Sequence, residues 1–218
     1  MAKLQVQHFS DVLCVWAYVG QIRVDELCRQ HGQHIEMNYH FVDVFGDIPG
    51  RVTQRWMDKG GLVSYGGHVL EVVARFEHVG VHPEVWTRNV PRSSQSCHLF
   101  LHAVQEAHGT QALEKAAWAL RESFFLRAQD VSTRLTQMQI AEELSLSRAE
   151  IEEHLDSGQA MSRLSYDARM AGEQGITVSP TLVFDEGRQV LRGNVGYRVI
   201  DANVQELLER EGLQHSWC

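Results

Sequence analysis

The residue best placed for chemistry is Cys14, the first residue of the segment Cys14-Val-Trp-Ala17. It directly precedes a stretch with helical periodicity, so its sulfur should face unpaired N–H groups and the positive end of a helix dipole. That position favours the thiolate, and thiols so placed can have a pKa well below the value of about 8.5 of a free cysteine. A thiolate is the nucleophile in disulfide exchange and in addition to electrophiles. Cys14 is therefore the predicted catalytic residue; the alternative is a small buried residue of the core.

The position three residues after Cys14 is Ala17, so the chain has no CxxC pair there. In such a pair the second thiol attacks the mixed disulfide and releases the product, which alanine cannot do. A mixed disulfide at Cys14 would therefore need an external thiol, and glutathione is the expected co-substrate. The other cysteines are far apart and should be free thiols in a reducing compartment. Cys28 lies ~21 Å further along the helix, Cys97 is typical of a core residue, and Cys218 is either a resolving thiol or without a role.

Two histidines, His98 and His102, are one helical turn apart, a spacing that can share a metal ion. We expect them to face solvent or a groove, and no third ligand is evident, so no metal site is predicted. They lie off the apolar stripe of their helix, which consists of Cys97, Phe100, Leu101 and Val104.

The overall composition excludes several classes of function. The formal net charge is −8 over 218 residues, which argues against nucleic acid and anionic membranes as partners. No stretch approaches the roughly 20 apolar residues of a membrane span, and the N-terminal residues lack the apolar core of a secretion signal. We therefore expect a cytoplasmic protein, either a monomer or a homodimer, with no permanently bound cofactor.

The elements around Cys14 are predicted by periodicity. An alternating pattern near residues 4–7 indicates a strand, and the spacing of Val15, Tyr18, Val19 and Ile22 indicates a helix that runs to about Gln30. A second alternating segment covers 35–41. Strand, helix and strand joined by short turns form a parallel βαβ unit.

The middle of the chain, residues 46–174, shows helical patterns alone. One stripe consists of Leu113, Ala117, Leu120 and Phe124, and Ser147 to Glu150 has the pattern of a capping box. The stretch from Gly46 to Gly67, with Pro49 and several glycines, is the least regular part. We expect it to be a mobile loop over the site.

The last part of the chain returns to strands. Two short strands, near 179–184 and 188–192, are joined by a polar turn and followed by a helix with Ile200, Val204, Leu207 and Leu208 on one face. Neither end of the chain can form a useful sheet alone. The sequence therefore predicts an α/β fold in which residues 1–45 and 175–218 share one mixed sheet, βαβ plus ββα, with residues 46–174 as an inserted helical domain.

That outline, together with Phe9-Ser-Asp-Val-Leu-Cys-Val-Trp-Ala-Tyr-Val-Gly20, resembles the DsbA-like thioredoxin-fold family. The segment is similar to the pattern S-D-x-x-C-P-W-C-Y-x-G of its FrnE-like branch, with Val15 in place of the proline and Ala17 in place of the second cysteine. Gly175-Ile-Thr-Val-Ser-Pro-Thr-Leu-Val-Phe184 is similar to the family's cis-proline loop. Gly193-Asn-Val-Gly-Tyr-Arg198 and the closing helix also match, whereas residues 46–90 fit poorly.

The resemblance implies roles for further residues. A cis bond between Ser179 and Pro180 would aim the backbone of Ser179 at the Cys14 sulfur and offer N–H and C=O groups to an extended thiol substrate. Trp16 would belong to the substrate surface or pack on the helix. Asp11 would modulate the thiolate or bond the backbone of the turn.

Tyr197 and Arg198 stand where glutathione-using relatives carry an Asp-Arg pair that helps to hold glutathione. These relatives are the kappa-class glutathione transferases and 2-hydroxychromene-2-carboxylate isomerases. Because Tyr197 is not an acid, the resemblance leaves this glutathione clamp incomplete.

Three functions follow from these residues. The first is a thiol-disulfide oxidoreductase or isomerase that uses Cys14 alone, with a small thiol or a disulfide-containing protein as partner. The second is a glutathione-dependent isomerase or transferase of small aromatic compounds. The third is a binding module of the thioredoxin fold without catalysis.

Overall fold

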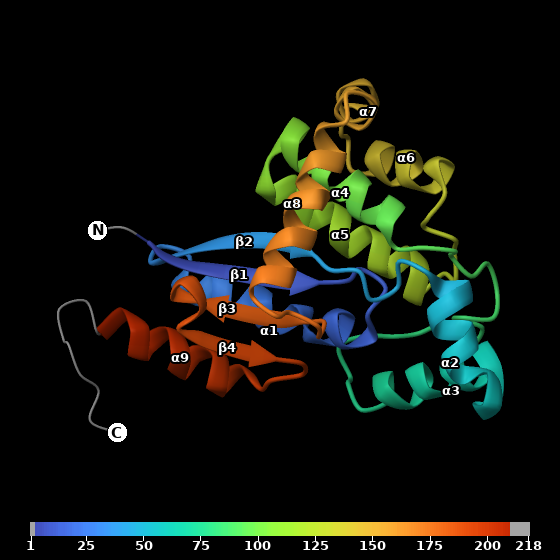
Figure 1. Ribbon diagram of the computed structural model, residues 1–218, viewed down its shortest axis with the longest axis horizontal. Coiled ribbons are helices and arrows are strands. Elements are labelled where there is room, and N and C mark those ends of the chain that lie inside the picture. The colour runs from blue at the N-terminus through green and yellow to red at the C-terminus, as the bar shows by residue number, and fades with distance from the viewer. Residues whose placement is uncertain (1–2, 210–218) are drawn as a thin grey trace.

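The computed structural model describes residues 3–209 and has a mixed four-stranded sheet at its centre (Figure 1). The chain begins with β1 (Leu4–Ser10), α1 (Val15–His31) and β2 (Ile35–Phe41), and β1 pairs with β2 in parallel from Leu4↔Ile35 to Ser10↔Phe41. This is the predicted βαβ unit.

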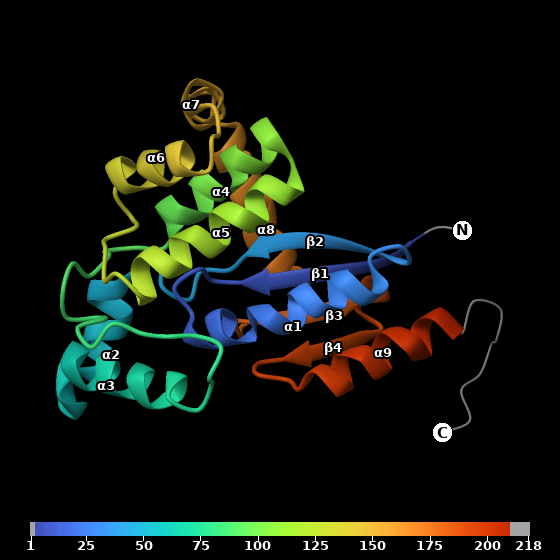
Figure 2. The same cartoon turned by 180° about the vertical axis from the view of Figure 1, so that it is seen from behind.

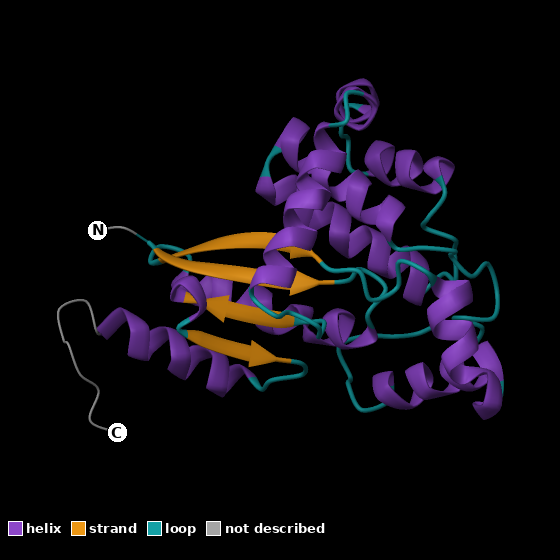
Figure 3. Cartoon of the chain, viewed as in Figure 1, coloured by secondary structure: helices purple, strands orange, loops and turns teal. Residues whose placement is uncertain are grey.

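The chain returns to the same sheet near its end. β3 (Thr181–Phe184) pairs antiparallel with β1, and β4 (Gln189–Arg192) pairs antiparallel with β3, so the strand order is β2-β1-β3-β4. α9 (Tyr197–Glu209) follows. Figure 3 shows the four strands as one sheet, with helices above and below it and one crossing in front of it. The predicted thioredoxin-like fold, with βαβ and ββα in one sheet and a helical insertion between them, is confirmed.

The segment between β2 and β3 is helical. Figures 1 and 2 place α4 to α7 beside β2, and α2 and α3 beyond the ends of β1 and β2. Its elements are a π-helical segment Ile48–Thr53, α2 (Gln54–Trp56), a 3-10 turn Met57–Lys59, α3 (Gly61–Val73), α4 (Gln95–His108), α5 (Thr110–Phe125), α6 (Arg134–Glu143), α7 (Arg148–Asp156) and α8 (Gln159–Glu173). Half of the predicted capping box is present: Ser147 Oγ accepts from the N–H of Glu150 at 3.4 Å, whereas the N–H of Ser147 donates to His108 Nε2 at 3.2 Å and not to Glu150.

Both faces of the sheet are covered. Val6 and Leu182 pack with Leu27 of α1 and Val204 of α9 on one face. On the other face, Phe9 and Val183 pack with Ala171 of α8 and with Ile176. Within residues 3–209 no helix has both the length and the apolar character needed to cross a membrane.

The helix predicted from the spacing of Val15, Tyr18, Val19 and Ile22 is α1, although 48% of Ile22 is exposed. One local expectation is wrong. The stretch from Gly46 to Gly67 is not a loop: it is helical from Ile48 onward, with Gly50, Gly66 and Gly67 inside helical segments and Gly60 between two of them.

The expectation for α4 is also wrong, because His98 and His102 are both fully buried. α4 packs against α5, α7 and α8, so more than one stripe of it is covered. His102 Nε2 donates to Asp167 Oδ2 of α8 at 2.7 Å, and His40 Nδ1 of β2 donates to Asp167 Oδ1 at 2.8 Å. The N–H of Phe41 donates to the same carboxylate at 2.8 Å. Asp167 therefore connects the helical insertion to the end of β2.

We predict that Asp167→Asn lowers the free energy of unfolding by about 3 kcal/mol or more, because it leaves buried donors without their charged acceptor. Burial alone would raise the pKa of Asp167, but the hydrogen bonds from His102 and His40 hold it below its ordinary 3.8. The stabilisation is therefore complete above that ordinary pKa and is lost as the pH falls through the lowered one. Urea unfolding at several pH values measures the difference between variant and wild type.

The matched control is Asp156→Asn, an exposed aspartate of α7. It should change stability by no more than about 0.5 kcal/mol. Equal effects of the two substitutions would show that Asp167 does not hold α8 to the sheet.

Candidate active site

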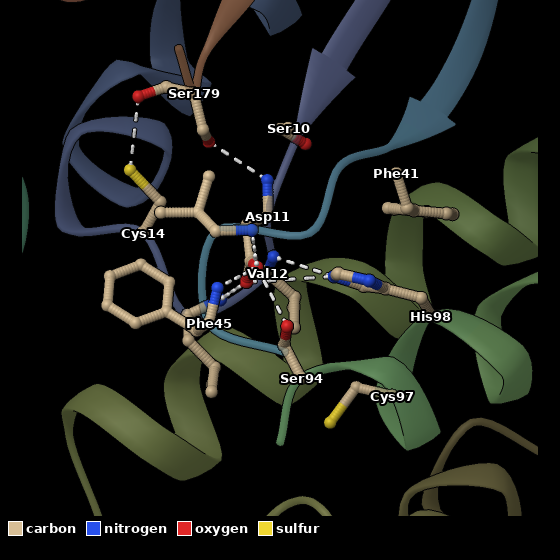
Figure 4. Close-up of polar contacts among 12 residues, drawn as sticks. Ser10, Asp11, Val12, Cys14, Phe41, Phe45, Ser94, Cys97, His98 and Ser179 are labelled. Carbon is tan, nitrogen blue, oxygen red and sulfur yellow. Dashed lines mark hydrogen bonds and ion pairs between the residues drawn. The ribbon is translucent and has the colours of Figure 1, made fainter. Parts of the chain in front are cut away.

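Cys14 stands at the N-terminus of α1 and faces the loop that enters β3 (Figure 4). Its Sγ donates a hydrogen bond to the backbone oxygen of Ser179 at 3.2 Å. The Ser179–Pro180 peptide bond is cis, as the resemblance implied. The first turn of α1 and the proline loop thus meet at the sulfur, although they are far apart in the sequence.

The carboxylate of Asp11 holds this corner together. Its Oδ1 accepts from the N–H of Leu13 at 3.0 Å, and its Oδ2 accepts from the N–H groups of Val44 and Phe45 at 3.1 and 2.8 Å and from Ser94 Oγ at 2.7 Å. The N–H of Asp11 itself donates to Ser179 Oγ at 2.9 Å. These bonds join the ends of β1 and β2, the start of α4 and the proline loop. The hydrogen bonds show Asp11 in one of its two predicted roles, the bonding of the backbone, and its charge also acts on the Cys14 thiol.

His98 completes the cluster that sequence reasoning missed. Its Nε2 lies 3.6 Å from Asp11 Oδ1 and accepts from the N–H of Val12 at 3.3 Å, and its ring stacks on Phe41 with centroids 5.0 Å apart. Burial alone would raise the pKa of Asp11, but the contact with His98 and the N–H groups of Phe45 and Leu13 hold it below its ordinary value. Asp11 is therefore a buried anion at neutral pH.

The expectation of a low pKa at Cys14 is wrong. Burial raises the pKa of the Cys14 thiol, and only 5% of the residue is exposed. The hydrogen bond with Ser179 and the N–H groups of Ala17 and Trp16 act in the opposite direction, as predicted for a helix N-terminus, and the charge of Asp11 adds to the effect of burial. The loss of hydration on burial therefore raises the pKa of the Cys14 thiol more than the N–H groups at the helix terminus lower it.

A cavity of about 270 Å³ opens beside this corner. It is lined by Thr177, which stands two residues before Ser179, and by the cationic side chains of Arg51 and Arg55 from the helical insertion. Tyr65 also lines it. Burial raises the pKa of Tyr65, and a negative charge on Cys14 raises it further. The carboxylate of Asp43, which pairs with Arg51, lines the cavity too, whereas Cys14 does not, so a small molecule with a negative group would meet Arg55 there.

The remaining predicted residues fall into two groups. Trp16 and Pro180 are half-buried, and Trp16 packs against the core of the helical insertion. Tyr197 and Arg198 begin α9, and the charged groups that influence Tyr197 are Asp201 of α9 and two residues in the last third of α1, Glu26 and Arg29. Since Glu26 lies ~18 Å along the helix from Cys14, the structure does not bring Tyr197 to the sulfur.

Neither the other cysteines nor the histidines form a second centre in the described residues. Cys28 and Cys97 are free thiols, and burial raises the pKa of Cys28 to about 11. Cys218 lies outside the described residues. Within residues 3–209 no group of three histidine, cysteine or acidic side chains could hold a metal ion.

Comparison with known proteins gives the family context. The model of the DSBA-like thioredoxin domain matches residues 5–205. Among curated proteins, the ClpXP adapter protein SpxH of Bacillus subtilis (strain 168) is 29% identical over 134 residues, covering 58% of this chain. That match takes in 44% of SpxH, and a second SpxH, from Bacillus licheniformis, is matched over 49% of its length, so the chain spans less than half of these relatives.

Solved structures share the fold over nearly the whole chain. A probable DsbA oxidoreductase of Streptomyces coelicolor has a TM-score of 0.75 at 19% identity, covering 98% of this chain and 94% of that one. The cytosolic disulfide reductase DsbM of Pseudomonas aeruginosa has a TM-score of 0.67 at 16% identity, covering 94% and 100%, and is also known with GSH. A 2-hydroxychromene-2-carboxylate isomerase has a TM-score of 0.66 at 15% identity, covering 97% and 100%.

We predict that Asp11→Asn has two separate effects, one on the stability of the fold and one on the reactivity of Cys14. It should lower the free energy of unfolding by about 3 kcal/mol, because an amide group replaces one of the acceptor oxygens with a donor that faces other donors. In the protein that remains folded, it should shift the alkylation of Cys14 to lower pH, because a negative charge near the sulfur is removed. Urea unfolding measures the first effect, and the rate of iodoacetamide labelling against pH measures the second.

Asp58→Asn, an exposed aspartate of the helical insertion, is the control and should change neither quantity. An alkylation profile that is unaltered in Asp11→Asn would mean that the Asp11 carboxylate does not act on the Cys14 sulfur.

Proposed function

The chain belongs to the DSBA-like thioredoxin domain family, and on that premise we propose that it is a thiol-disulfide oxidoreductase or isomerase with Cys14 as its single nucleophile. The observation that carries the proposal is the position of the Cys14 sulfur, 3.2 Å from the backbone oxygen of Ser179 next to a cis proline. A sulfur beside a peptide carbonyl at the start of a strand is placed to meet the extended chain around a disulfide.

The first step is the attack of the Cys14 thiolate on one sulfur of a substrate disulfide. The S–S bond breaks, the second sulfur leaves as a thiolate and takes up a proton, and a mixed disulfide with Cys14 forms. When Cys14 loses its proton, the oxygen of Ser179 no longer receives the thiol hydrogen bond. That oxygen can then accept a hydrogen bond from the backbone N–H of the bound substrate, as at the edge of a sheet.

The second step requires a thiol from outside, because Ala17 stands where the family pattern has its second cysteine. The external thiolate attacks the substrate sulfur of the mixed disulfide. Cys14 leaves as a thiolate, and the external thiol and the substrate sulfur form a new disulfide. We propose glutathione for this role. Its carboxylates match the guanidinium groups of Arg51 and Arg55 in the cavity beside Cys14.

Of these two arginines, Arg55 is the one available to a ligand. Arg51 donates to the backbone oxygen of Asp43 at 2.8 Å and lies 3.5 Å from its carboxylate. Arg55 is exposed and has no ion pair with any described residue. A fold neighbour, DsbM, is known with GSH, which supports this choice of thiol.

A binding module without turnover is the second candidate function. The curated relatives are adapter proteins, and the raised pKa of the buried Cys14 thiol reduces the fraction present as thiolate. Under this alternative the surface at Pro180 would hold a partner segment and Cys14 would form no covalent bond. We propose the cytoplasm as the location, because the three cysteines in the described residues are free thiols.

We predict that oxidised glutathione forms a mixed disulfide at Cys14, which reduced glutathione removes, and that Cys14→Ser abolishes it. Ala17→Cys should convert the chain to a dithiol protein, since the new thiol lies one helical turn from Cys14 and can attack the adduct. The adduct should then be replaced by a Cys14–residue 17 disulfide. Intact-mass spectrometry, with peptide mapping, follows each species.

Cys97→Ser is the matched control, since Cys97 is a fully buried thiol and its loss should leave the adduct unchanged. If wild-type protein forms no adduct at Cys14 at any pH at which it is folded, the oxidoreductase proposal fails and the binding module is supported.

We also predict that Arg55→Gln lowers the rate of glutathione adduct formation about threefold at low ionic strength, which is the expected effect of one exposed charge. The difference from wild type should disappear at high salt. The control is Arg134→Gln on α6, an exposed arginine that does not line the cavity. A neutral disulfide such as oxidised 2-mercaptoethanol should react equally with both variants; a threefold loss there would contradict a role in charge recognition.

A further inference from the structure

A second cavity, of about 290 Å³, lies between the end of β2, α4, α8 and the segment that leads to the cis proline. Its size is close to the lower end of the range of about 300–1,000 Å³ that small-molecule pockets have. Most of its wall is apolar, and the lining residues include Val42, Leu164, Ala168, Ala171 and Ile176. Ala168 and Gly172 of α8 are exposed, so the cavity is open to solvent along this helix.

One polar side chain of the cavity wall, His98 of α4, is deeply buried. Only 1% of His98 is exposed, although the residue lines the cavity. Its Nε2 accepts a hydrogen bond from the N–H of Val12 at 3.3 Å and lies 3.6 Å from Asp11 Oδ1 (Figure 4). The segment before Cys14 therefore occupies this side of the ring.

The other ring nitrogen of His98, Nδ1, is a donor without a partner. A neutral imidazole that accepts at Nε2 carries its proton on Nδ1, and an imidazolium carries a proton there as well. Nδ1 forms no hydrogen bond with any described residue. The ring cannot easily turn to find one, because it stacks on Phe41 with centroids 5.0 Å apart. A buried donor without an acceptor costs free energy, and the cavity has room for a ligand that supplies the acceptor.

The charges around the cavity favour an uncharged ligand. Among the described residues, no lysine or arginine lines it. Asp43 does, and its carboxylate already pairs with Arg51 at 3.5 Å and accepts from Gln95 Nε2 at 3.4 Å. Asp11, on the Nε2 side of His98, is a buried anion. A ligand carboxylate would meet these negative charges and no cation of the wall, whereas a carbonyl oxygen needs only the proton on Nδ1.

We propose that this cavity is a binding site for a small, uncharged and mainly apolar molecule with a carbonyl oxygen that accepts the hydrogen bond of His98 Nδ1. The apolar wall covers the body of the ligand. Gln95 and Thr177 are exposed polar residues of the same wall and face the solvent side of the ligand. Binding involves no covalent step.

The site adjoins the residues used in the proposed function. It shares Asp43, Val44 and Thr177 with the cavity that contains Arg55, so the two cavities meet at these residues. His98 connects the site to Asp11, which bonds the turn before Cys14. The inference goes beyond the proposed function and does not depend on it, because no thiol and no disulfide takes part in the binding.

The test uses acetophenone, an uncharged ketone, as the probe. Toluene lacks the carbonyl acceptor, and benzoate carries a negative charge. Titrations of ¹⁵N-labelled protein, followed by the amide signals of Gly172, Ile176 and Thr177, measure the dissociation constant of each compound. Acetophenone should bind about fivefold more tightly than toluene, which is the effect of about one hydrogen bond. Benzoate should bind more weakly than acetophenone.

Two kinds of variant separate the cavity from the hydrogen bond. Ala168→Leu should abolish the binding of acetophenone, because the larger side chain fills the cavity; the matched control is Ala149→Leu, an exposed alanine of α7 outside the cavity wall. His98→Gln should remove the preference for acetophenone over toluene, since its amide oxygen can still accept from Val12 but Nδ1 is lost. His98→Asn, whose amide N–H lies near the place of Nδ1, should keep the preference.

A measurement on the wild-type protein does not depend on the folding of any variant. The ¹⁵N signal of His98 Nδ1 should move when acetophenone binds and should stay in place with toluene. Acetophenone that leaves the cavity signals unchanged would overturn the inference and indicate a cavity that holds water alone. Acetophenone that binds no more tightly than toluene or benzoate would overturn it as well.

The inference and the proposed function can fail separately. Binding of acetophenone at His98 requires no exchange at Cys14, so it can be present in a protein that forms no glutathione adduct. Conversely, a protein that forms the adduct but does not bind acetophenone would retain the oxidoreductase and lose the second site.

Discussion

The arrangement of this site depends on one buried carboxylate, that of Asp11. Four backbone or hydroxyl donors from the Cys14 turn, the segment after β2 and the start of α4 converge on it, and its own N–H holds the hydroxyl of Ser179. A buried charge is tolerated when hydrogen bonds satisfy it, and here those bonds come from segments that the sheet alone would not align. The carboxylate of Asp11 holds the Cys14 turn and its N–H holds Ser179, so the relative position of the Cys14 sulfur and the Ser179 oxygen follows from this one residue. Asp167 provides a second such acceptor further from the sulfur, where it connects α8 and α4 to β2.

The charge of Asp11 also makes ionisation of the Cys14 thiol less favourable. A negative charge three residues before Cys14 and a nearly closed environment both disfavour a second negative charge on sulfur. The N–H groups at the start of α1 do not compensate fully, because loss of hydration of the sulfur on burial outweighs them.

The sequence predicted the features that depend on local pattern. The strand and helix bounds around Cys14 and the N-cap at Ser147 are each set by side chains within a few residues. The prediction of the cis bond between Ser179 and Pro180, which the structure has, came from the family resemblance. The pairing of Asp11 with His98 could not be predicted, because it joins residues 87 positions apart. Periodicity placed His98 and His102 outside the apolar stripe, but α4 is covered on several sides, so a polar position was buried too. The helical conformation after Gly46 was likewise masked by glycines and Pro49.

Burial of Cys14 and the absence of a second cysteine have a joint kinetic consequence. A thiol with a raised pKa is present less often as thiolate, but each thiolate is a stronger nucleophile and a poorer leaving group. A mixed disulfide at Cys14 should therefore form slowly and also be released slowly from the Cys14 side. In the proposed mechanism Ala17 leaves no internal route of release, so access of an external thiol to Cys14 would set the lifetime of the adduct. A chain with these properties retains its covalent partner for longer than a dithiol enzyme does. Catalysis of exchange and durable binding of a thiol partner would then use the same site. They would differ in whether an external thiol is supplied to release the partner.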